Sequence, residues 1–254
     1  MTSSLRIIAA ACAALLAVAA PQAVRAQNFS PAQRSDIERV VHDYLLAHPE
    51  VLQEAMSELE KRQTAAQAEK YKVAVKEHAQ TLFSSPNQVT LGNPKGNVTF
   101  VEFFDYNCGY CKRAMDDMLT LLKDDPKLKV VLKEFPVLGP GSLEAARVAV
   151  AVRMQDPKKY LEFHTKLLGG RGAADEAHAL AVAKDIGMNM AQIQKDAKSP
   201  EVKATLDEDF KLAEALGLNG TPSYVIGSDV VVGAIGLPGL QEKINTARCG
   251  KPTC

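Results

Sequence analysis

Apolar side chains recur at helical spacing soon after the start of the chain. Ser30-Pro31-Ala32-Gln33 is a capping box with proline at the first helical position, which predicts where this helix begins. One apolar helical face follows, made of Ile37, Val40, Val41, Tyr44 and Leu45. His48-Pro49 ends the helix, because the residue before a proline avoids the helical conformation, and Pro49 can begin another.

The second predicted helix is amphipathic only in part. Four of its apolar residues recur every seven positions: Leu52, Leu59, Ala66 and Val73. The alternate heptad position is polar in two of three repeats, with Met56 followed by Gln63 and Lys70. Such a helix buries little of itself alone, so we expect its apolar face to pack in a homo-oligomer, a dimer or a trimer. The alternative is a solvated linker helix.

The pattern changes to that of a β-α-β unit after residue 86. Val89-Thr90-Leu91 and residues 97–104 are rich in β-forming side chains, and the longer run is typical of a strand covered on both faces. A helix over 112–122 and a strand over 129–135 complete the unit. Sequential strands joined by a helix predict a parallel pair.

The remainder of the chain is a long helical stretch followed by a hairpin. Residues 142–216 have helical patterns broken by glycine and proline. Strand signals return at 223–226 and 230–233 around a short turn, and a last helix covers 240–247. A split set of strands with interposed helices predicts an α/β fold, in which helices flank a small central sheet.

The first 26 residues have the three parts of a secretory signal peptide. One positive charge precedes an uncharged apolar run over residues 7–20, and Val24-Arg25-Ala26 provides small residues before a cut at Gln27. The run is short for a bilayer span, so a retained membrane anchor is the less favoured alternative. We therefore expect an exported protein, located in the periplasm if the host is Gram-negative.

Composition excludes several classes of function. Lys+Arg number 30 and Asp+Glu number 30, and this balance argues against a nucleic-acid partner, which would require a basic excess. The sequence contains neither a phosphate-binding loop nor a Ser–His–Asp signature, and its five histidines lack metal-ligand spacing, so we expect no cofactor and no metal. Four cysteines remain after the predicted cleavage, in a compartment where disulfides persist.

Cys108-Gly109-Tyr110-Cys111 is the strongest chemical signal. It follows a buried strand and opens a helix, where free backbone N–H groups and the helix dipole favour a thiolate over a thiol. A thiolate attacks disulfides, so Cys108 is the predicted nucleophile and Cys111 the residue that resolves the mixed disulfide. A zinc site shared with Cys249 and Cys254, or a purely structural bridge, are the alternatives.

Three separate motifs resemble the DsbA-like thioredoxin-fold proteins. Residues 101–111 (VEFFDYNCGYC) look like their active-site strand and helix, 133–139 (KEFPVLG) like their second strand, and 220–226 (GTPSYVI) like their cis-proline loop. Residues 44–50 (YLLAHPE) are similar to the N-terminal extension of the ScsC-like branch, named for suppression of copper sensitivity. The resemblance implies a thioredoxin fold with an inserted helical domain and an N-terminal helical arm.

The same resemblance divides the chain and adds binding residues. We expect a signal peptide at 1–26, a helical oligomerisation arm at 27–86 and a catalytic domain at 87–254, with the helical insertion at about 141–216. The family implies a cis Thr221–Pro222 bond, whose neighbouring backbone can pair with an extended peptide. The expected substrate-binding residues are Gly109, Tyr110, Thr221 and Pro222.

Glu102 and Lys133 are charged residues within otherwise apolar strands. If neighbouring strands bring them together beneath the dithiol, the buried carboxyl can relay a proton as Cys111 turns over. The alternative is that one or both side chains face solvent.

Tyr110 bears on the direction of the reaction. DsbA has a histidine at this position, and a tyrosine cannot place a positive charge beside the thiolate, so the disulfide should be less oxidising. Cys-Gly-Tyr-Cys is also the pair of the DsbC isomerases. We therefore expect isomerisation or reduction of disulfides in protein substrates, with a membrane thiol reductase as electron donor; a DsbA-type oxidase and a copper-binding stress protein are the alternatives.

Cys249 and Cys254 lie in a C-terminal tail, CGKPTC. We expect a local structural disulfide. A copper(I) site is the alternative, because thiolates are soft ligands.

Overall fold

The computed structural model describes residues 29–254, so the predicted signal peptide lies outside the described residues. The chain divides into two units between Leu59 and Glu60. The division falls within one helix, because α2 (Glu50–Glu77) contributes to both units. Of the described residues, no helix is both long enough and apolar enough to cross a membrane.

The first unit contains α1 (Pro31–Ala47) and the start of α2. The predicted capping box is confirmed: the Ser30 hydroxyl accepts a hydrogen bond from the Gln33 backbone N–H, and the Gln33 side chain accepts one from the Ser30 N–H. Most apolar residues of this unit are exposed, and α1 buries none of its residues. The exposed set comprises Phe29, Ile37, Val40, Val41, Tyr44, Leu46, Leu52, Met56 and Leu59.

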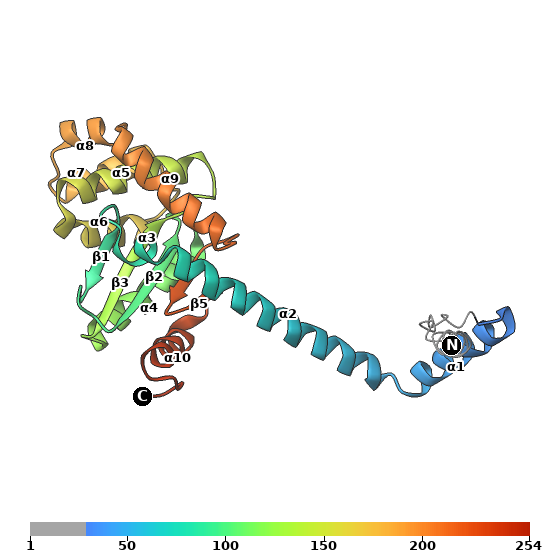
Figure 1. Cartoon of the computed structure of the whole chain (residues 1–254). Coiled ribbons are helices and arrows are strands. Elements are labelled where there is room, and N and C mark those ends of the chain that lie inside the picture. The colour runs from blue at the N-terminus through green and yellow to red at the C-terminus, as the bar shows by residue number, and fades with distance from the viewer. Residues whose placement is uncertain (1–28) are drawn as a thin grey trace, which may run out of the picture. The chain divides into compact units, whose positions relative to one another are not determined.

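A five-stranded sheet organises the second unit, in the order β1-β3-β2-β4-β5. Its strands are β1 (Val89–Gly92), β2 (Val98–Phe104), β3 (Leu128–Glu134), β4 (Ser223–Ile226) and β5 (Asp229–Val232). The central strands β2 and β3 are parallel, as predicted for a β-α-β unit, and every other neighbouring pair is antiparallel. The predicted hairpin is formed by β4 and β5. Strands β1, β2, β3 and β5 are labelled in Figure 1.

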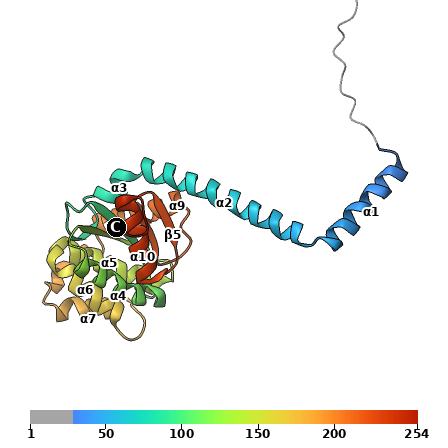
Figure 2. The same ribbon diagram turned by 90° about the horizontal axis from the view of Figure 1, so that it is seen from below.

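Helices cover both faces of this sheet. α4 (Gly109–Asp124) and α10 (Gly236–Cys249) lie together on one face of the sheet (Figure 2). The core on this face includes Phe100, Phe104, Val130 and Tyr224. α3 (Ala79–Ser84) and α9 (Pro200–Ala215) cover the other face, where Val101, Phe103, Val131 and Val225 are buried. Strands buried on both faces explain why their sequences are continuously apolar.

The helical insertion lies between β3 and β4 along the chain. It contains α5 (Pro140–Gln155), α6 (Tyr160–Gly169), α7 (Glu176–Asp185), α8 (Met190–Asp196) and α9, with a short 3-10 turn at Pro157–Lys159. These helices gather at one end of the sheet (Figure 1). α5 lies at the centre of the insertion, and its buried alanine and valine side chains pack against the helices around it.

Two predicted helices are longer than expected. The helix predicted at 112–122 extends over Gly109–Asp124, and the one predicted at 240–247 extends over Gly236–Cys249. In α4 the first turn contains the exposed Gly109 and Tyr110, which apolar periodicity does not mark. The observed start of α4 agrees with the expectation that the cysteine motif opens this helix.

Candidate active site

Cys108 is the N-cap residue of α4. Its sulfur accepts a hydrogen bond from the backbone N–H of Cys111, with 3.4 Å between Sγ and N. β2 ends at Phe104 and a short loop leads to the cap, so the strand delivers the sulfur to the positive end of a 16-residue helix. The predicted setting for a stabilised thiolate is therefore present.

The two sulfurs differ in accessibility. Both cysteines are free thiols; Cys108 retains 6% of its surface and Cys111 none. Burial raises the pKa of the Cys111 thiol far above its ordinary value, and the negative charge of Glu102 contributes to the same effect. Cys108 is consequently the more accessible of the two sulfurs, and the Cys111 thiol is protonated at neutral pH.

The proline loop lies directly beside Cys108. The Thr221–Pro222 peptide bond is cis, as the resemblance implied. The Cys108 thiol donates to the Thr221 carbonyl oxygen across 3.2 Å, and the Pro222 carbonyl accepts from the Gly233 N–H. Segments 113 residues apart in the chain thus meet at the sulfur.

Gly109 and Tyr110 are the exposed residues between the two cysteines. Tyr110 is 60% exposed, and a Cβ placed on Gly109 would meet no other atom. The Arg113 guanidinium stacks over the Tyr110 ring at 4.5 Å from its centroid. The tyrosine itself adds no charge, but its position brings a cation close to the surface around the dithiol.

Glu102 lies on the dithiol side of the sheet. Its neighbours across the strands are Leu132 and Tyr224, and it is 3% exposed. Burial, reinforced by the negative charge of Asp117, raises the pKa of the Glu102 carboxyl to about 8. The group therefore holds a proton at neutral pH and is placed on the same face as Cys111.

Lys133 lies on the opposite face, so the expected pairing with Glu102 is wrong. In the parallel register Lys133 is opposite Phe103, one position away from Glu102, and successive side chains of a strand point to opposite faces. Its ammonium group instead contacts Asp209 at 3.2 Å and Glu208 at 3.4 Å.

Lys133 also ties α3 to the sheet. Its Nζ donates to the Thr81 carbonyl, while the Asp209 carboxylate accepts from the Glu134 N–H. Lys133 is fully buried, and an ion pair is what such a lysine requires. Its observed contacts hold α3 and α9 on the face away from the dithiol.

Sequence reasoning missed the three residues between β2 and Cys108. Asp105 is buried and accepts hydrogen bonds from the N–H groups of Asn107 and Leu138. Asn107 reaches two segments of the helical insertion, through Ser142 and Ala174. The signal in the sequence was the polar Asp-Tyr-Asn run between a buried strand and a cysteine pair.

A second missed group is a buried polar cluster behind this loop. The Tyr160 hydroxyl donates to the Glu134 carboxyl at 2.7 Å, and the Tyr106 hydroxyl lies within 3.5 Å of Glu134, Tyr160 and His164. Burial raises the pKa of Glu134 well above its usual range and lowers that of His164 to about 3. His164 is therefore neutral at pH 7.

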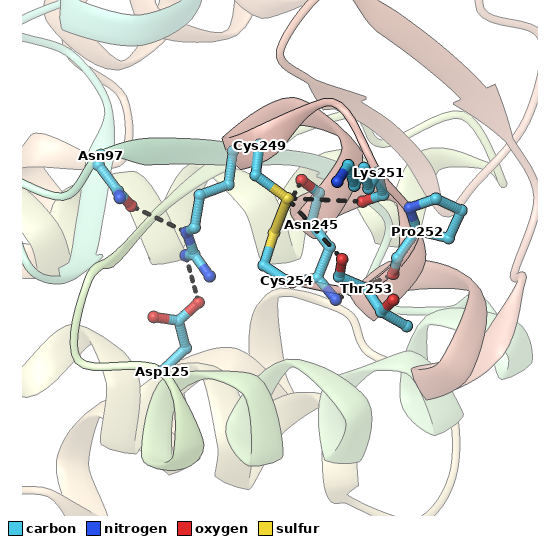
Figure 3. The surroundings of a disulfide bond; sticks show 9 residues. Asn97, Asp125, Asn245, Cys249, Lys251, Pro252, Thr253 and Cys254 are labelled. Atoms are coloured by element: carbon cyan, nitrogen blue, oxygen red, sulfur yellow. Dashed lines mark hydrogen bonds and ion pairs between the residues drawn. A yellow bond between two sulfur atoms is a disulfide. The ribbon is translucent and has the colours of Figure 1, made fainter.

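The C-terminal disulfide is separate from this site. Cys249 and Cys254 are bonded, as expected, and both are exposed. The last turn of α10 that carries Cys249 is fastened to the domain by Arg248, which pairs with Asp125 and donates to Asn97 (Figure 3). Within residues 29–254, no three His, Cys, Asp or Glu side chains gather as a metal site.

Two solved structures that share this fold are an oxidoreductase and a thiol-disulfide exchange protein. A thioredoxin-like oxidoreductase from Silicibacter pomeroyi DSS-3 is 45% identical, covers 66% of this chain and 96% of its own, and superposes with a TM-score of 0.64. The thiol-disulfide exchange protein alpha-DsbA2 from Wolbachia pipientis is 30% identical over 71% and 97% of the two chains, with a TM-score of 0.66.

A ScsC structure extends the similarity into the N-terminal helices. Proteus mirabilis ScsC, in a transitional conformation, is 26% identical, covers 87% of this chain and 98% of its own, and has a TM-score of 0.65. Residues 33–66 match the copper resistance protein ScsC N-terminal domain.

The chain also matches a segment of longer curated proteins. The Na(+)/H(+) antiporter NhaA 1 of Mycobacterium sp. (strain KMS) is 28% identical over 142 residues, which are 53% of this chain and 22% of the antiporter. The chain thus spans about a fifth of the length of the curated relatives that it matches first.

More than half of the chain, residues 99–245, matches the DSBA-like thioredoxin domain, and this interval contains the dithiol, the cis-proline loop and the whole sheet except β1 and the first residue of β2. The topology is the expected thioredoxin fold with a helical insertion and N-terminal helices. The chain belongs to the DSBA-like thioredoxin family of thiol–disulfide oxidoreductases.

Proposed function

We propose that this chain reduces or isomerises non-native disulfides in protein substrates of the periplasm. The observation that carries the proposal is the position of one sulfur. Cys108 accepts an N–H hydrogen bond at a helix N-terminus while it touches the backbone of the cis-proline loop. A helix N-terminus stabilises a thiolate, and the loop offers main-chain groups to an extended peptide.

The proposed reaction has two exchange steps. The Cys108 thiolate attacks one sulfur of the substrate disulfide, forming a mixed disulfide and releasing the other substrate sulfur as a thiolate. For isomerisation, the freed substrate thiolate attacks another disulfide of the substrate and displaces a new thiolate. That thiolate then attacks the substrate sulfur of the mixed disulfide, which forms a new substrate disulfide and releases Cys108 as a thiolate. For reduction, Cys111 loses its proton and attacks the Cys108 sulfur, which forms the Cys108–Cys111 disulfide and frees a substrate dithiol.

Glu102 in its ionised form is the group proposed to take the Cys111 proton; with a pKa of about 8, that form is the minor one at pH 7. It is buried on the same face of the sheet as Cys111, and its negative charge raises the pKa of that thiol. A carboxyl whose pKa is about 8 is well matched to proton transfer near neutral pH. Lys133 is left out of this step because it contacts Asp209 on the other face.

Tyr110 favours reduction or isomerisation over oxidation. An oxidase gains driving force from a cation that stabilises the released thiolate, and Tyr110 itself supplies none. The nearby Arg113 stacks on the tyrosine ring, and a cation placed there would act in the other direction. An assay that compares oxidation with isomerisation measures whether the uncharged Tyr110 or the nearby Arg113 has the larger effect.

Scrambled ribonuclease tests the direction of the reaction. The reduced protein should restore ribonuclease activity, and Cys108→Ser should not. Cys111→Ser should retain Cys108 chemistry and accumulate a mixed disulfide with the substrate, which gel electrophoresis without reductant can detect. Rapid oxidation of reduced ribonuclease by the disulfide form, with no recovery of the scrambled enzyme, would establish the oxidase alternative instead.

The exposed apolar residues of α1 and α2 support an oligomer as part of this proposal. α1 buries none of its side chains, and Leu52, Leu59 and Val73 of the seven-residue repeat are exposed. An oligomer would hold several dithiols around one substrate. Light scattering on the chain with and without residues 27–80 tests this; two monomeric profiles would contradict it.

Export and electron supply complete the proposal. The signal-like pattern of residues 1–26 supports a periplasmic location, and a dithiol that acts as reductant needs a donor, which we propose is a membrane thiol reductase. The resting redox state of Cys108 in periplasmic extracts, trapped by alkylation, tests both. A reduced Cys108 supports a reductase or isomerase, whereas an oxidised one contradicts it.

A further inference from the structure

The backbone immediately before Cys108 is fixed to the helical insertion by one amide side chain. Asn107 uses its oxygen to accept from the Ala174 N–H at 2.8 Å, and its nitrogen to donate to the Ala174 carbonyl at 2.8 Å. The same nitrogen donates to the Ser142 hydroxyl at 2.9 Å. Three hydrogen bonds of good length therefore link the residue next to the nucleophile to α5 and to the segment before α7.

The Asn107 backbone is held as firmly as its side chain. Its N–H donates to the Asp105 carboxylate at 2.8 Å, and the other oxygen of that carboxylate accepts from the Leu138 N–H at 2.9 Å. Asp105 is 1% exposed, so these bonds lie in a setting where losing a partner is costly. The loop between β2 and α4 is thus braced from both sides.

The insertion is also attached on the other side of the dithiol. Lys112, which directly follows Cys111, donates from Nζ to the Gly170 carbonyl at 2.6 Å. Gly170 and Ala174 belong to one segment, which joins α6 to α7. That segment is therefore tied to the chain both before and after the cysteine pair.

We propose that Asn107 is a positioning residue for thiol–disulfide exchange. By locking the loop to Ser142 and Ala174, it holds the Cys108 sulfur where the Cys111 N–H can reach it. The thiolate of Cys108, and with it the reduction potential of the dithiol, then depends on a contact with the helical insertion. This inference rests on the proposed role of Cys108 as the attacking sulfur.

Asn107→Ala tests the inference because it removes all three side-chain bonds. The rate at which Cys108 is alkylated at pH 7 should fall about 3- to 10-fold, the size expected when a buried hydrogen-bonded support is lost. The ultraviolet titration of the thiolate should shift to higher pH in parallel. Ser142→Ala removes one of the three bonds, and should shift both readings in the same direction by a smaller factor.

Asn189→Ala is the matched control. Asn189 also lies in the insertion and also supports local structure, by capping α8 through the Gln192 N–H. This variant should lose stability while Cys108 reactivity stays at the wild-type value. Should Asn107→Ala and Ser142→Ala both titrate like wild type, the inference is overturned.

The same measurements separate this inference from the proposed function. If wild-type Cys108 is alkylated no faster than free cysteine, the proposed function itself fails. If wild-type Cys108 is fast and both variants are equally fast, only the role of Asn107 fails. Should Asn107→Ala not fold, the comparison of Ser142→Ala with wild type decides.

Discussion

The molecule has two cysteine pairs, and they lie at opposite kinds of helix end. Cys108 caps the N-terminus of α4, where its sulfur accepts the Cys111 N–H. Cys249 is the last residue of α10, and the sulfur of Cys254 lies 3.3 Å from the Asn245 carbonyl oxygen. Cys108 also lies 3.2 Å from a carbonyl oxygen, that of Thr221, so the two pairs differ in the helix end and not in the carbonyl contact. The positive N-terminal end of α4 stabilises a thiolate, and the negative C-terminal end of α10 disfavours one.

This difference separates a reactive pair from a structural one. The first pair is nearly buried beside the cis-proline loop, with a carboxyl on its face of the sheet, whereas the second is exposed at the end of the chain. Accessibility alone would suggest the reverse assignment, because the exposed pair is easier to reach. The ends of the two helices, rather than exposure, are therefore the basis on which the Cys108–Cys111 pair is proposed as the reactive one.

The largest expected effect is the loss of activity on replacing one cysteine of the first pair. Cys108→Ser leaves a hydroxyl, which is a far weaker nucleophile toward disulfides, so the disulfide reductase rate should fall to background. The double variant Cys249→Ser/Cys254→Ser is the matched control and should retain the wild-type rate. Turnover of an insulin disulfide measures both. If the double variant were as inactive as Cys108→Ser, the C-terminal pair would also be required for activity, which contradicts its assignment as structural.

Glu102 is a buried carboxyl beside the first cysteine pair, and its ionisation lowers the free energy of unfolding. Among the residues that the structure describes, the second pair lacks such a group. Because burial raises the pKa of Glu102 to about 8, the folded protein binds an extra proton between about pH 4.5 and 8, relative to the unfolded chain. The free energy of unfolding should fall as pH rises through this range. Glu102→Gln removes the titration, so it should be more stable than wild type by about 3 to 5 kcal/mol at pH 9 and nearly equal at pH 5.

Urea unfolding at the two pH values measures this effect, and Lys133→Met is its control on the other face. Removing Lys133 leaves the buried Asp209 without its ion-pair partner, so this variant should lose stability at pH 9, where Asp209 is charged, and lose less at pH 5, because burial raises the pKa of Asp209 to about 7. Glu102→Gln should also slow the step in which Cys111 resolves the mixed disulfide. Equal stability of Glu102→Gln and wild type at pH 9 would mean that the carboxyl is charged at no cost.

The C-terminal disulfide should contribute stability and nothing else. It closes a loop with a sequence separation of 5, and a loop so short restricts the unfolded chain by about 2 kcal/mol. The Cys249→Ser/Cys254→Ser variant should lose about that much free energy of unfolding, while the Arg248–Asp125 pair still fastens the end of α10. Urea denaturation gives the difference; an unchanged free energy would contradict the structural assignment.

Local patterns in the sequence predict most of the fold. The capping box at Ser30, the parallel strand pair and the hairpin at 223–233 are all signalled by residues close together in the chain. The dithiol is predicted for the same reason, because its strand, its turn and its helix are consecutive. The cis bond at Pro222 depended on family resemblance, since a Gly-Thr-Pro sequence alone indicates only a turn.

What the sequence could not give is register and long-range contact. Glu102 and Lys133 both stand in buried strands, but a difference of one position in the pairing decides that they face opposite sides. The contact of Asn107 with Ala174 joins residues 67 positions apart, and no local pattern marks it. The sequence therefore predicted the two cysteines of the candidate site, but not the hydrogen bonds that hold their loop in place.

The redox equilibria of the two pairs provide the most direct test of the comparison. A helix end changes the energy of a nearby charge by about 0.3 to 1 kcal/mol, and the two ends act in opposite senses here. The dithiol of Cys108 and Cys111 should therefore be the more stable as a reduced pair, with a reduction potential about 13 to 43 mV above that of Cys249 and Cys254. Graded glutathione buffers, followed by alkylation and mass spectrometry of each peptide, give both midpoints in one sample. Coincident midpoints, or a C-terminal disulfide that is reduced first, would show that helix ends do not set the reactivity of these sulfurs.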